Sequence, residues 1–191
     1  MTISSFAPAV VLSSLALLVA VPAHAQQALQ PAQSSIQFTA KQMGVPLEGH
    51  FKKFGAQIAF DPAKLATSRI AFTVDTGSAT LGSRETDAEL PKPTWFNVPQ
   101  FPQATFQSSS IKALGGGKFE VAGKLTIKGQ SRDVTVPVTL TQSGATTTAT
   151  GTLAIKRLAF KIGENEWADT SMVADDVQVQ FKLALTGVGK L

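Results

Sequence analysis

The feature that most constrains this chain is the alternation of apolar and polar residues along most of its length. Ile36, Phe38 and Ala40 lie on alternate positions, and so do Phe72 and Val74 further along. A period of two places successive side chains on opposite faces of a β-strand, with one face buried and the other in solvent. The same pattern recurs in segments at residues 104–106, 119–127, 134–140, 153–155 and 177–185. The sequence therefore predicts half-buried strands.

The segment from Leu47 to Phe60 changes phase once. Leu47 and Phe51 lie on odd positions, whereas Phe54 and Phe60 lie on even positions. The change falls at Lys52-Lys53, where a bulge or sharp bend would let one long strand keep its apolar face inward while the sheet curls. With this segment the chain has about eight strands, most of them joined by short turns that contain glycine or proline.

This pattern predicts an all-β fold, an eight-stranded antiparallel up-and-down barrel. A two-sheet sandwich is the alternative, because strand spacing does not distinguish closure from stacking. Two segments, residues 81–100 and 157–171, do not alternate, and they hold both tryptophans of the chain. The first has helix-favouring residues from Ser83 to Leu90, with Ser83 as a candidate N-cap. These segments could cap the barrel, form the mouth of a ligand site, or do both.

The first 25 residues have the character of a secretory signal peptide. They contain no charged side chain. An apolar run from Val10 to Val21 is followed by the triplet Ala23-His24-Ala25. The run is shorter than the about 20 residues of a membrane-spanning helix. The small residues Ala23 and Ala25 suit cleavage near Ala25. We therefore expect residues 1–25 to be a signal peptide and residues 26–191 to form one soluble periplasmic domain. An uncleaved membrane anchor is the alternative.

The amino-acid composition excludes several classes of catalytic and metal-binding site. The chain has no cysteine, which excludes disulfides, thiol catalysis and cysteine-based metal sites. Removal of the signal peptide leaves one histidine, His50, too few for a histidine metal cage. No Gly-x-Ser-x-Gly elbow accompanies His50, so we predict no catalytic residues, no metal and no enzyme activity. The net charge of +4 on an exported protein favours anionic lipid or glycan over nucleic acid as a partner.

From Ser35 to Val188 the chain resembles the YceI-like family of secreted lipid-binding proteins. The matching stretches are Ser35-Ile36-Gln37-Phe38, Gly49-His50-Phe51-Lys52-Lys53-Phe54, Ala56-Gln57-Ile58-Ala59-Phe60-Asp61, Trp95-Phe96-Asn97, Phe101-Pro102-Gln103-Ala104-Thr105-Phe106 and Gly123-Lys124-Leu125-Thr126-Ile127-Lys128-Gly129. The resemblance implies a lipocalin-like barrel with an elongated apolar tunnel for a polyisoprenoid chain and a short helix and loop cap. The stretch from Ile162 to Asp169 is similar to a subgroup that accompanies membrane cytochromes of the b561 type.

The interior of such a barrel holds the candidate ligand contacts. Bulky rings alternate with small residues such as Ala104 and Gly123, which permits either a filled core or a channel lined by rings. The resemblance favours the channel. The apolar candidates for its wall are Phe38, Phe51, Phe54, Phe60, Phe72, Phe106, Phe119, Val121, Leu125 and Phe181.

At the mouth we expect Trp95, Phe96 and Trp167 near the opening, with Arg84 or Arg157 facing the head group. A guanidinium fork can satisfy phosphate or carbonyl oxygens. An arginine beside carboxylates can equally be a solvated surface charge. The head-group assignment therefore depends on which arginine the fold turns toward the ligand.

The resemblance implies a function without catalysis: binding, storage or transport of a long-chain isoprenoid lipid, such as a polyprenyl phosphate or a ubiquinone-like molecule, in the periplasm. The alternative is an accessory protein that docks on a b561-type cytochrome and assists electron transfer or stress tolerance. We expect no resident cofactor besides a bound lipid or quinone. Relatives that look dimeric suggest a homodimer.

Overall fold

The computed structural model describes residues 27–191, so the expected signal peptide and its cleavage site lie outside the described part of the chain. The strands are β1 (Ala28–Leu29), β2 (Ser35–Gln42), β3 (Val45–Phe51), β4 (Phe54–Ala59), β5 (Arg69–Asp75), β6 (Ala79–Thr80), β7 (Gln103–Gly115), β8 (Lys118–Ile127), β9 (Gln130–Ser143), β10 (Thr146–Lys156) and β11 (Asp176–Thr186). The α-helix α1 (Arg84–Glu89) is short, and so are the 3-10 turns η1 (Pro31–Gln33), η2 (Leu65–Thr67), η3 (Thr76–Ser78), η4 (Arg157–Phe160) and η5 (Asn165–Ala168).

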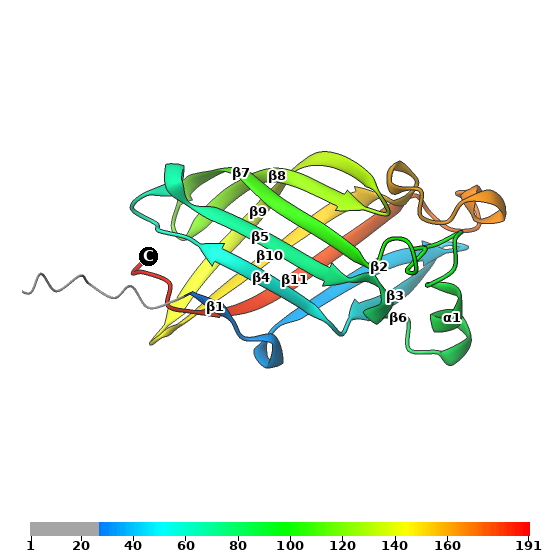
Figure 1. Cartoon of the computed structure of the whole chain (residues 1–191), viewed down its shortest axis with the longest axis horizontal. Coiled ribbons are helices and arrows are strands. Elements are labelled where there is room, and N and C mark those ends of the chain that lie inside the picture. Colours follow the sequence, from blue (N-terminus) through cyan, green and yellow to red (C-terminus); the bar gives the residue numbers. More distant parts are fainter. Residues whose placement is uncertain (1–26) are drawn as a thin grey trace, which may run out of the picture.

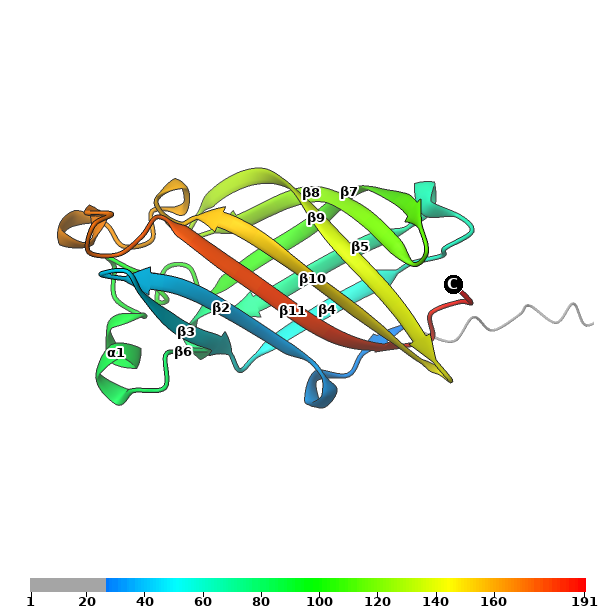
Figure 2. The ribbon, with the colours of Figure 1, turned by 180° about the vertical axis from the view of Figure 1, so that it is seen from behind.

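All strands belong to one antiparallel sheet in the order β4-β5-β7-β8-β9-β10-β11-β2-β3-β6, with β1 paired to β11. Figures 1 and 2 show that this sheet curls into an elongated half-barrel whose long strands run obliquely to its length. The all-β antiparallel prediction is confirmed, and the single sheet excludes the sandwich alternative. The hydrogen-bonded path does not close on itself, since β4 and β6 form its two ends.

The phase change at Lys52-Lys53 marks the corner that brings these ends together. The prediction of one long bent strand is wrong, because β3 pairs with β2 and β6 whereas β4 pairs with β5. Ser78 stabilises the corner with two hydrogen bonds. Its carbonyl accepts one from the Lys52 amide at 3.1 Å, and its hydroxyl accepts one from the Lys53 amide at 3.0 Å. If β3 and β4 are counted as one strand, as the sequence predicted, the eight expected strands correspond to β2, β3 with β4, β5 and β7 to β11. The two-residue strands β1 and β6 are too short to produce an alternation.

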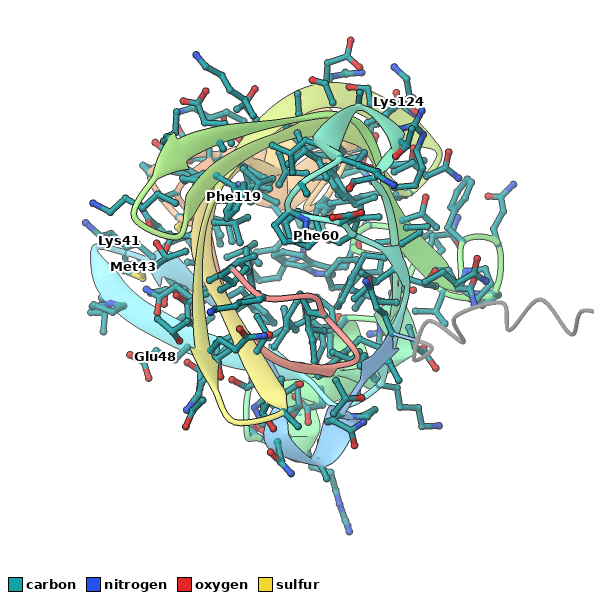
Figure 3. The ribbon with its side chains drawn as sticks, turned by 90° about the vertical axis from the view of Figure 1, so that its left-hand side faces the viewer. Lys41, Met43, Glu48, Phe60, Phe119 and Lys124 are labelled. Carbon is teal, nitrogen blue, oxygen red and sulfur yellow. The ribbon has the colours of Figure 1, made fainter. Side chains whose placement is uncertain are left out.

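The alternation separates an apolar interior from a polar exterior. Figure 3 looks along the half-barrel from the end that holds the C-terminus, with Phe60 and Phe119 inside the ring of strands and Lys41, Glu48 and Lys124 outside it. We call this end the tail end. The opposite end, on the right in Figure 1, carries α1, η4 and η5. Within residues 27–191 no helix is long and apolar enough to span a bilayer.

The helix expected between Ser83 and Leu90 forms where the sequence predicts it. Ser83 stands at the N-cap position, but its side chain makes no capping hydrogen bond. Instead the Asp87 carboxylate accepts hydrogen bonds from the Thr80 hydroxyl at 2.5 Å and from the Leu81 amide at 2.6 Å. These two bonds hold the pKa of Asp87 below its ordinary value and attach α1 to β6.

Candidate ligand-binding tunnel

The half-barrel is hollow. It contains two cavities of about 210 Å³ and 250 Å³, which we call the tail-end cavity and the cap-end cavity. Six residues, each from a different strand, line both cavities, and we call this ring the waist. Its members are Ile36, Val74, Ala104, Leu125, Leu153 and Val179. The shared ring joins the cavities end to end along the barrel axis.

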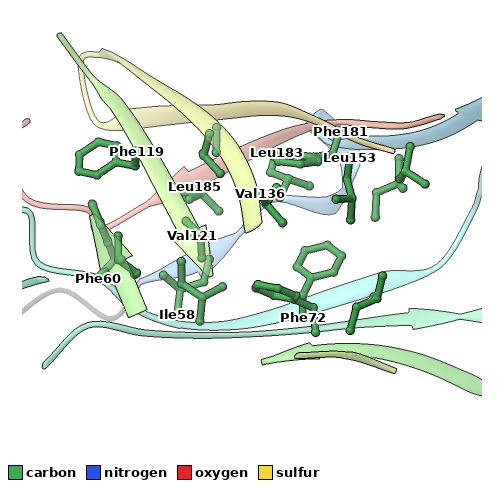
Figure 4. Close-up of a pocket in the computed structure, with 18 of the residues that line it drawn as sticks. Ile58, Phe60, Phe72, Phe119, Val121, Val136, Leu153, Phe181, Leu183 and Leu185 are labelled. Atoms are coloured by element: carbon green, nitrogen blue, oxygen red, sulfur yellow. The ribbon is translucent and has the colours of Figure 1, made fainter. Parts of the chain in front are cut away.

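The tail-end cavity is lined by apolar side chains with one exception, the hydroxyl-bearing Thr105. Figure 4 shows Phe60 and Phe119 at one end of this cavity and Phe72 and Phe181 toward the other. The rings of Phe60 and Phe119 meet edge to face, with centroids 5.4 Å apart. An apolar surface of this kind can bind hydrocarbon but offers nothing to orient a polar group.

Three phenylalanine rings are laid against the wall by glycines. A Cβ atom at Gly123 would approach the Phe106 ring to 2.5 Å, and one at Gly49 or Gly151 would collide with the ring of Phe38 or Phe181. Phe38 faces Gly49 directly across β2 and β3, and Phe181 faces Gly151 across β10 and β11. Because the glycines have no side chain, these rings lie over the neighbouring backbone instead of crossing the interior. This packing explains how a chain rich in phenylalanine encloses open space.

The cap-end cavity lies beneath the two non-alternating segments, which meet at one end as the sequence suggests. We call residues 81–100 and 157–171 the cap segments. Trp95 and Trp167, one from each segment, lie with ring centroids 5.5 Å apart and both line the cavity. The Phe51 ring packs against the rings of Phe38 and Phe96, with centroids 5.3 Å and 6.1 Å away, and extends this aromatic cluster to the barrel wall.

Arg157 lines this cavity, but its guanidinium group is fully hydrogen-bonded to backbone carbonyls. The side chain is 1% exposed, and all five guanidinium N–H groups donate to backbone carbonyls. The acceptors are Ala174 (3.0 Å from Nε), Ile162 and Gly163 (2.9 Å from Nη1), and Trp167 and Val173 (2.6 Å from Nη2). Burial lowers the pKa of Arg157, and the Asp175 carboxylate opposes that change. No donor of Arg157 is left for a ligand.

Lys128 is a second buried cation at the cap, and sequence reasoning missed it. Its residue lies in the turn between β8 and β9 with a left-handed φ of 47°, and it is 6% exposed. The ammonium donates to the carbonyls of Pro93 and Lys161, both at 2.6 Å, and to the Glu164 carboxylate at 2.9 Å. These three bonds tie both cap segments to the sheet. In the sequence Lys128-Gly129 carries only a turn signal.

Most of the predicted wall residues line one cavity or the other. The tail-end cavity contains Phe60, Phe72, Phe106, Phe119, Val121, Leu125 and Phe181, and the cap-end cavity contains Phe38, Phe51, Trp95, Phe96, Leu125, Arg157 and Trp167. Their contact with a ligand stays a prediction. Leu153 of the waist and two polar residues of α1, Thr86 and Glu89, also line the cap-end cavity, although the sequence did not mark them as ligand contacts.

Two predicted residues line neither cavity. Phe54 is half-buried on the inward face of β4, opposite Val74 of β5, and stacks on Phe72 with ring centroids 6.0 Å apart, so it lies beside the cavity wall. Arg84 is exposed at the first position of α1. Thr86 and Glu89, three positions apart, share the face that reaches the cavity, and Arg84 lies on another face of the same helix.

Comparison with known proteins identifies the family. Residues 28–185 match the model of the YceI-like domain. The chain belongs to the YceI-like family. Among its relatives are UPF0312 proteins of Vibrio cholerae, 30% identical over 128 residues, and of Yersinia pestis, 34% identical over 110 residues. The matches cover 64% and 57% of this chain and 68% and 57% of the respective relatives.

Solved structures of YceI-like proteins share this architecture. BcnA of Burkholderia cenocepacia is 50% identical, with a TM-score of 0.79 over 82% of this chain and 98% of BcnA. A polyisoprenoid-binding domain from Saccharophagus degradans, implicated in plant cell wall breakdown, has a TM-score of 0.68 over 84% of this chain and 98% of that domain. At 14% identity the second likeness shows the fold alone.

Proposed function

We propose that this YceI-like protein binds a long-chain isoprenoid lipid in its tunnel and serves as a non-catalytic carrier or reservoir in the periplasm. The observation that carries the proposal is the pair of apolar cavities joined at the waist. Each square ångström of apolar surface that a chain removes from water contributes about 25 cal/mol before the costs of binding are subtracted. Binding of this kind requires no catalytic group.

Family membership supports the same ligand class. The chain belongs to the YceI-like family, and one structural neighbour is a polyisoprenoid-binding domain. An isoprenoid is long, flexible and apolar, and a tunnel of two successive cavities suits a ligand of that shape better than a compact one. The polar residues of the lining gather at the cap end, where we place the head group.

The waist offers the sharpest test, because Ala104 is its smallest member. In an Ala104→Phe variant the ring would occupy the passage between the cavities and exclude a chain that must cross it. Native mass spectrometry of gently purified protein should detect a stoichiometric lipid in the parent and strongly reduced occupancy in the variant. Ala154→Phe is the matched control, because Ala154 lies on the outward face of β10 beside Leu153 and is exposed.

An empty parent protein, or an Ala104→Phe variant that keeps its lipid, would contradict the proposal. Periplasmic location is part of it and is tested separately, since N-terminal sequencing of exported protein should begin at or near Gln26. Docking on a b561-type cytochrome stays a prediction from the family resemblance, as does the homodimer. An empty tunnel in a protein that still binds the cytochrome would favour that role.

A further inference from the structure

We infer that the cap-end cavity selects lipids with an uncharged head group and discriminates against the same chain ending in a phosphate. This inference rests on the proposed function and narrows its ligand class. It follows from the hydrogen-bonding state of every charged side chain that lines the cavity, together with one buried donor that has no partner within residues 27–191.

The two buried cations at the cap end have no donors to offer a phosphate. Arg157, the only basic residue that lines the cavity, gives its five N–H groups to five backbone carbonyls. Lys128, buried close by, gives its three to Pro93, Lys161 and Glu164. A phosphate could recruit either side chain only by breaking the bonds that hold the cap segments together.

The remaining charge in the lining is negative. Glu89 lines the cavity from α1, and its carboxylate pairs at 2.5 Å with Lys92, a residue outside the lining. A phosphate inside this cavity would meet a carboxylate that repels it and two buried cations, Arg157 and Lys128, whose donors are already engaged. Burial of an anion without compensating partners is strongly unfavourable, whereas a hydroxyl or carbonyl loses far less on leaving water.

A neutral head group, by contrast, finds partners. Trp95 lines the cavity, and its indole Nε1–H is buried without a hydrogen-bond partner among the described residues. Indole N–H is a donor only, so it suits a hydroxyl or carbonyl oxygen. The Glu89 carboxylate is an acceptor and suits a hydroxyl hydrogen. Together they match an uncharged oxygen-bearing group such as the end of a polyprenol.

The direct test measures binding of a polyprenol and of its monophosphate, with equal chain length, to the delipidated mature protein by native mass spectrometry. We expect the alcohol to bind at least about 10-fold more tightly, a difference of about 1.4 kcal/mol. If the phosphate binds as tightly or more tightly, the inference is overturned and the proposed function stands. If neither compound binds, both the proposed function and the inference are overturned.

A charge reversal assigns the selectivity to the cavity. In Glu89→Lys a free ammonium replaces the carboxylate, so affinity for the monophosphate should rise at least about 10-fold while affinity for the alcohol changes little. Glu85→Lys is the matched control, because Glu85 is exposed on the same helix and lines neither cavity. An equal gain in both variants would assign the effect to overall charge and overturn the role of the cavity.

A second variant tests the neutral donor. Trp95→Phe keeps an aromatic ring but removes the N–H, so the polyprenol should bind several-fold more weakly. A polyprene hydrocarbon of the same length, which has no oxygen, should bind both proteins with similar affinity. This comparison separates the lost hydrogen bond from altered packing against Trp167. Equal losses for the alcohol and the hydrocarbon would show that Trp95 acts only as an apolar wall.

Discussion

The two ends of the tunnel are closed in different ways. At the cap end, Arg157 and Lys128 are buried and donate all their N–H groups to the protein. At the tail end, Val188 packs against the apolar core, and the Gln142 side chain forms hydrogen bonds with Val188, Gly189 and Leu191 at 3.3 to 3.5 Å. Hydrogen bonds of that length are weak.

This difference bears on where a ligand passes. The sequence leads us to expect the cap segments to form the gate, since only irregular segments could close an end. That expectation stays a prediction. Of the two ends, the cap has the denser hydrogen bonding, while Val188 of the tail lines the tail-end cavity. We therefore expect the tail end to open more readily, because local opening favours regions with few buried contacts and exposed hydrogen bonds.

The largest expected effect comes from removal of the Arg157 side chain. Arg157→Met should lower the free energy of unfolding by about 3 kcal/mol or more, because each buried carbonyl left without a donor costs about 1–3 kcal/mol. Arg157→Lys should be intermediate, since an ammonium has three N–H donors where the guanidinium has five. Chemical denaturation measures both. The exposed Arg84→Met should change stability by no more than about 0.5 kcal/mol, and a similar loss at both arginines would refute the special role of Arg157.

A smaller loss should follow at the second buried cation. Lys128→Met removes three hydrogen bonds and leaves the partly exposed Glu164 carboxylate without its partner, for an expected loss of about 2 kcal/mol. Lys124→Met is the control, because its ion pair with Asp133 lies on the surface and such pairs contribute about 0–1 kcal/mol. Equal denaturation midpoints for the two variants would mean that Lys128 does not hold the cap.

At the tail end the expected change is kinetic. Gln142→Ala should lower the free energy of unfolding by about 1 kcal/mol, since its three bonds to the tail are long and exposed and its fourth, to the Thr147 hydroxyl at 3.2 Å, is partly buried. Release of bound lipid should nevertheless become faster. Hydrogen exchange should show faster opening at residues 188–191 than at the amides of the cap segments in the parent protein. Slower exchange at the tail than at the cap would reverse the comparison.

The smallest effect concerns pH at the attachment of α1. Hydrogen bonds from Thr80 and Leu81 lower the pKa of Asp87 in the folded protein, so its contribution to stability is complete above the unfolded pKa of about 3.9. That contribution is lost as the pH falls through the lower folded pKa. Asp87→Asn should therefore weaken the dependence of unfolding on pH below about 4. An unchanged dependence would show that the carboxylate does not stabilise the helix attachment.

The strands and their inward faces could be predicted from local sequence pattern alone. Alternation depends on local geometry, because every second side chain of a strand faces the same way, and so Phe38, Phe72 and Phe181 could be assigned to the interior. The change of phase at Lys52-Lys53 likewise located a real corner. The position of the helix after Ser83 followed from local propensity, although Ser83 makes no capping hydrogen bond.

Contacts between distant parts of the chain determine whether the interior is hollow and what the buried cations do, so these features could not be predicted from local pattern. Phe106 lies flat because Gly123 of the neighbouring strand has no Cβ, and that contact depends on the register between β7 and β8. Arg157 and Lys128 bond mainly to backbone carbonyls, which every residue carries and no sequence pattern marks. Their partners are selected when the chain brings the cap segments over the end of the sheet, since long flexible side chains take the acceptors that the fold places within reach.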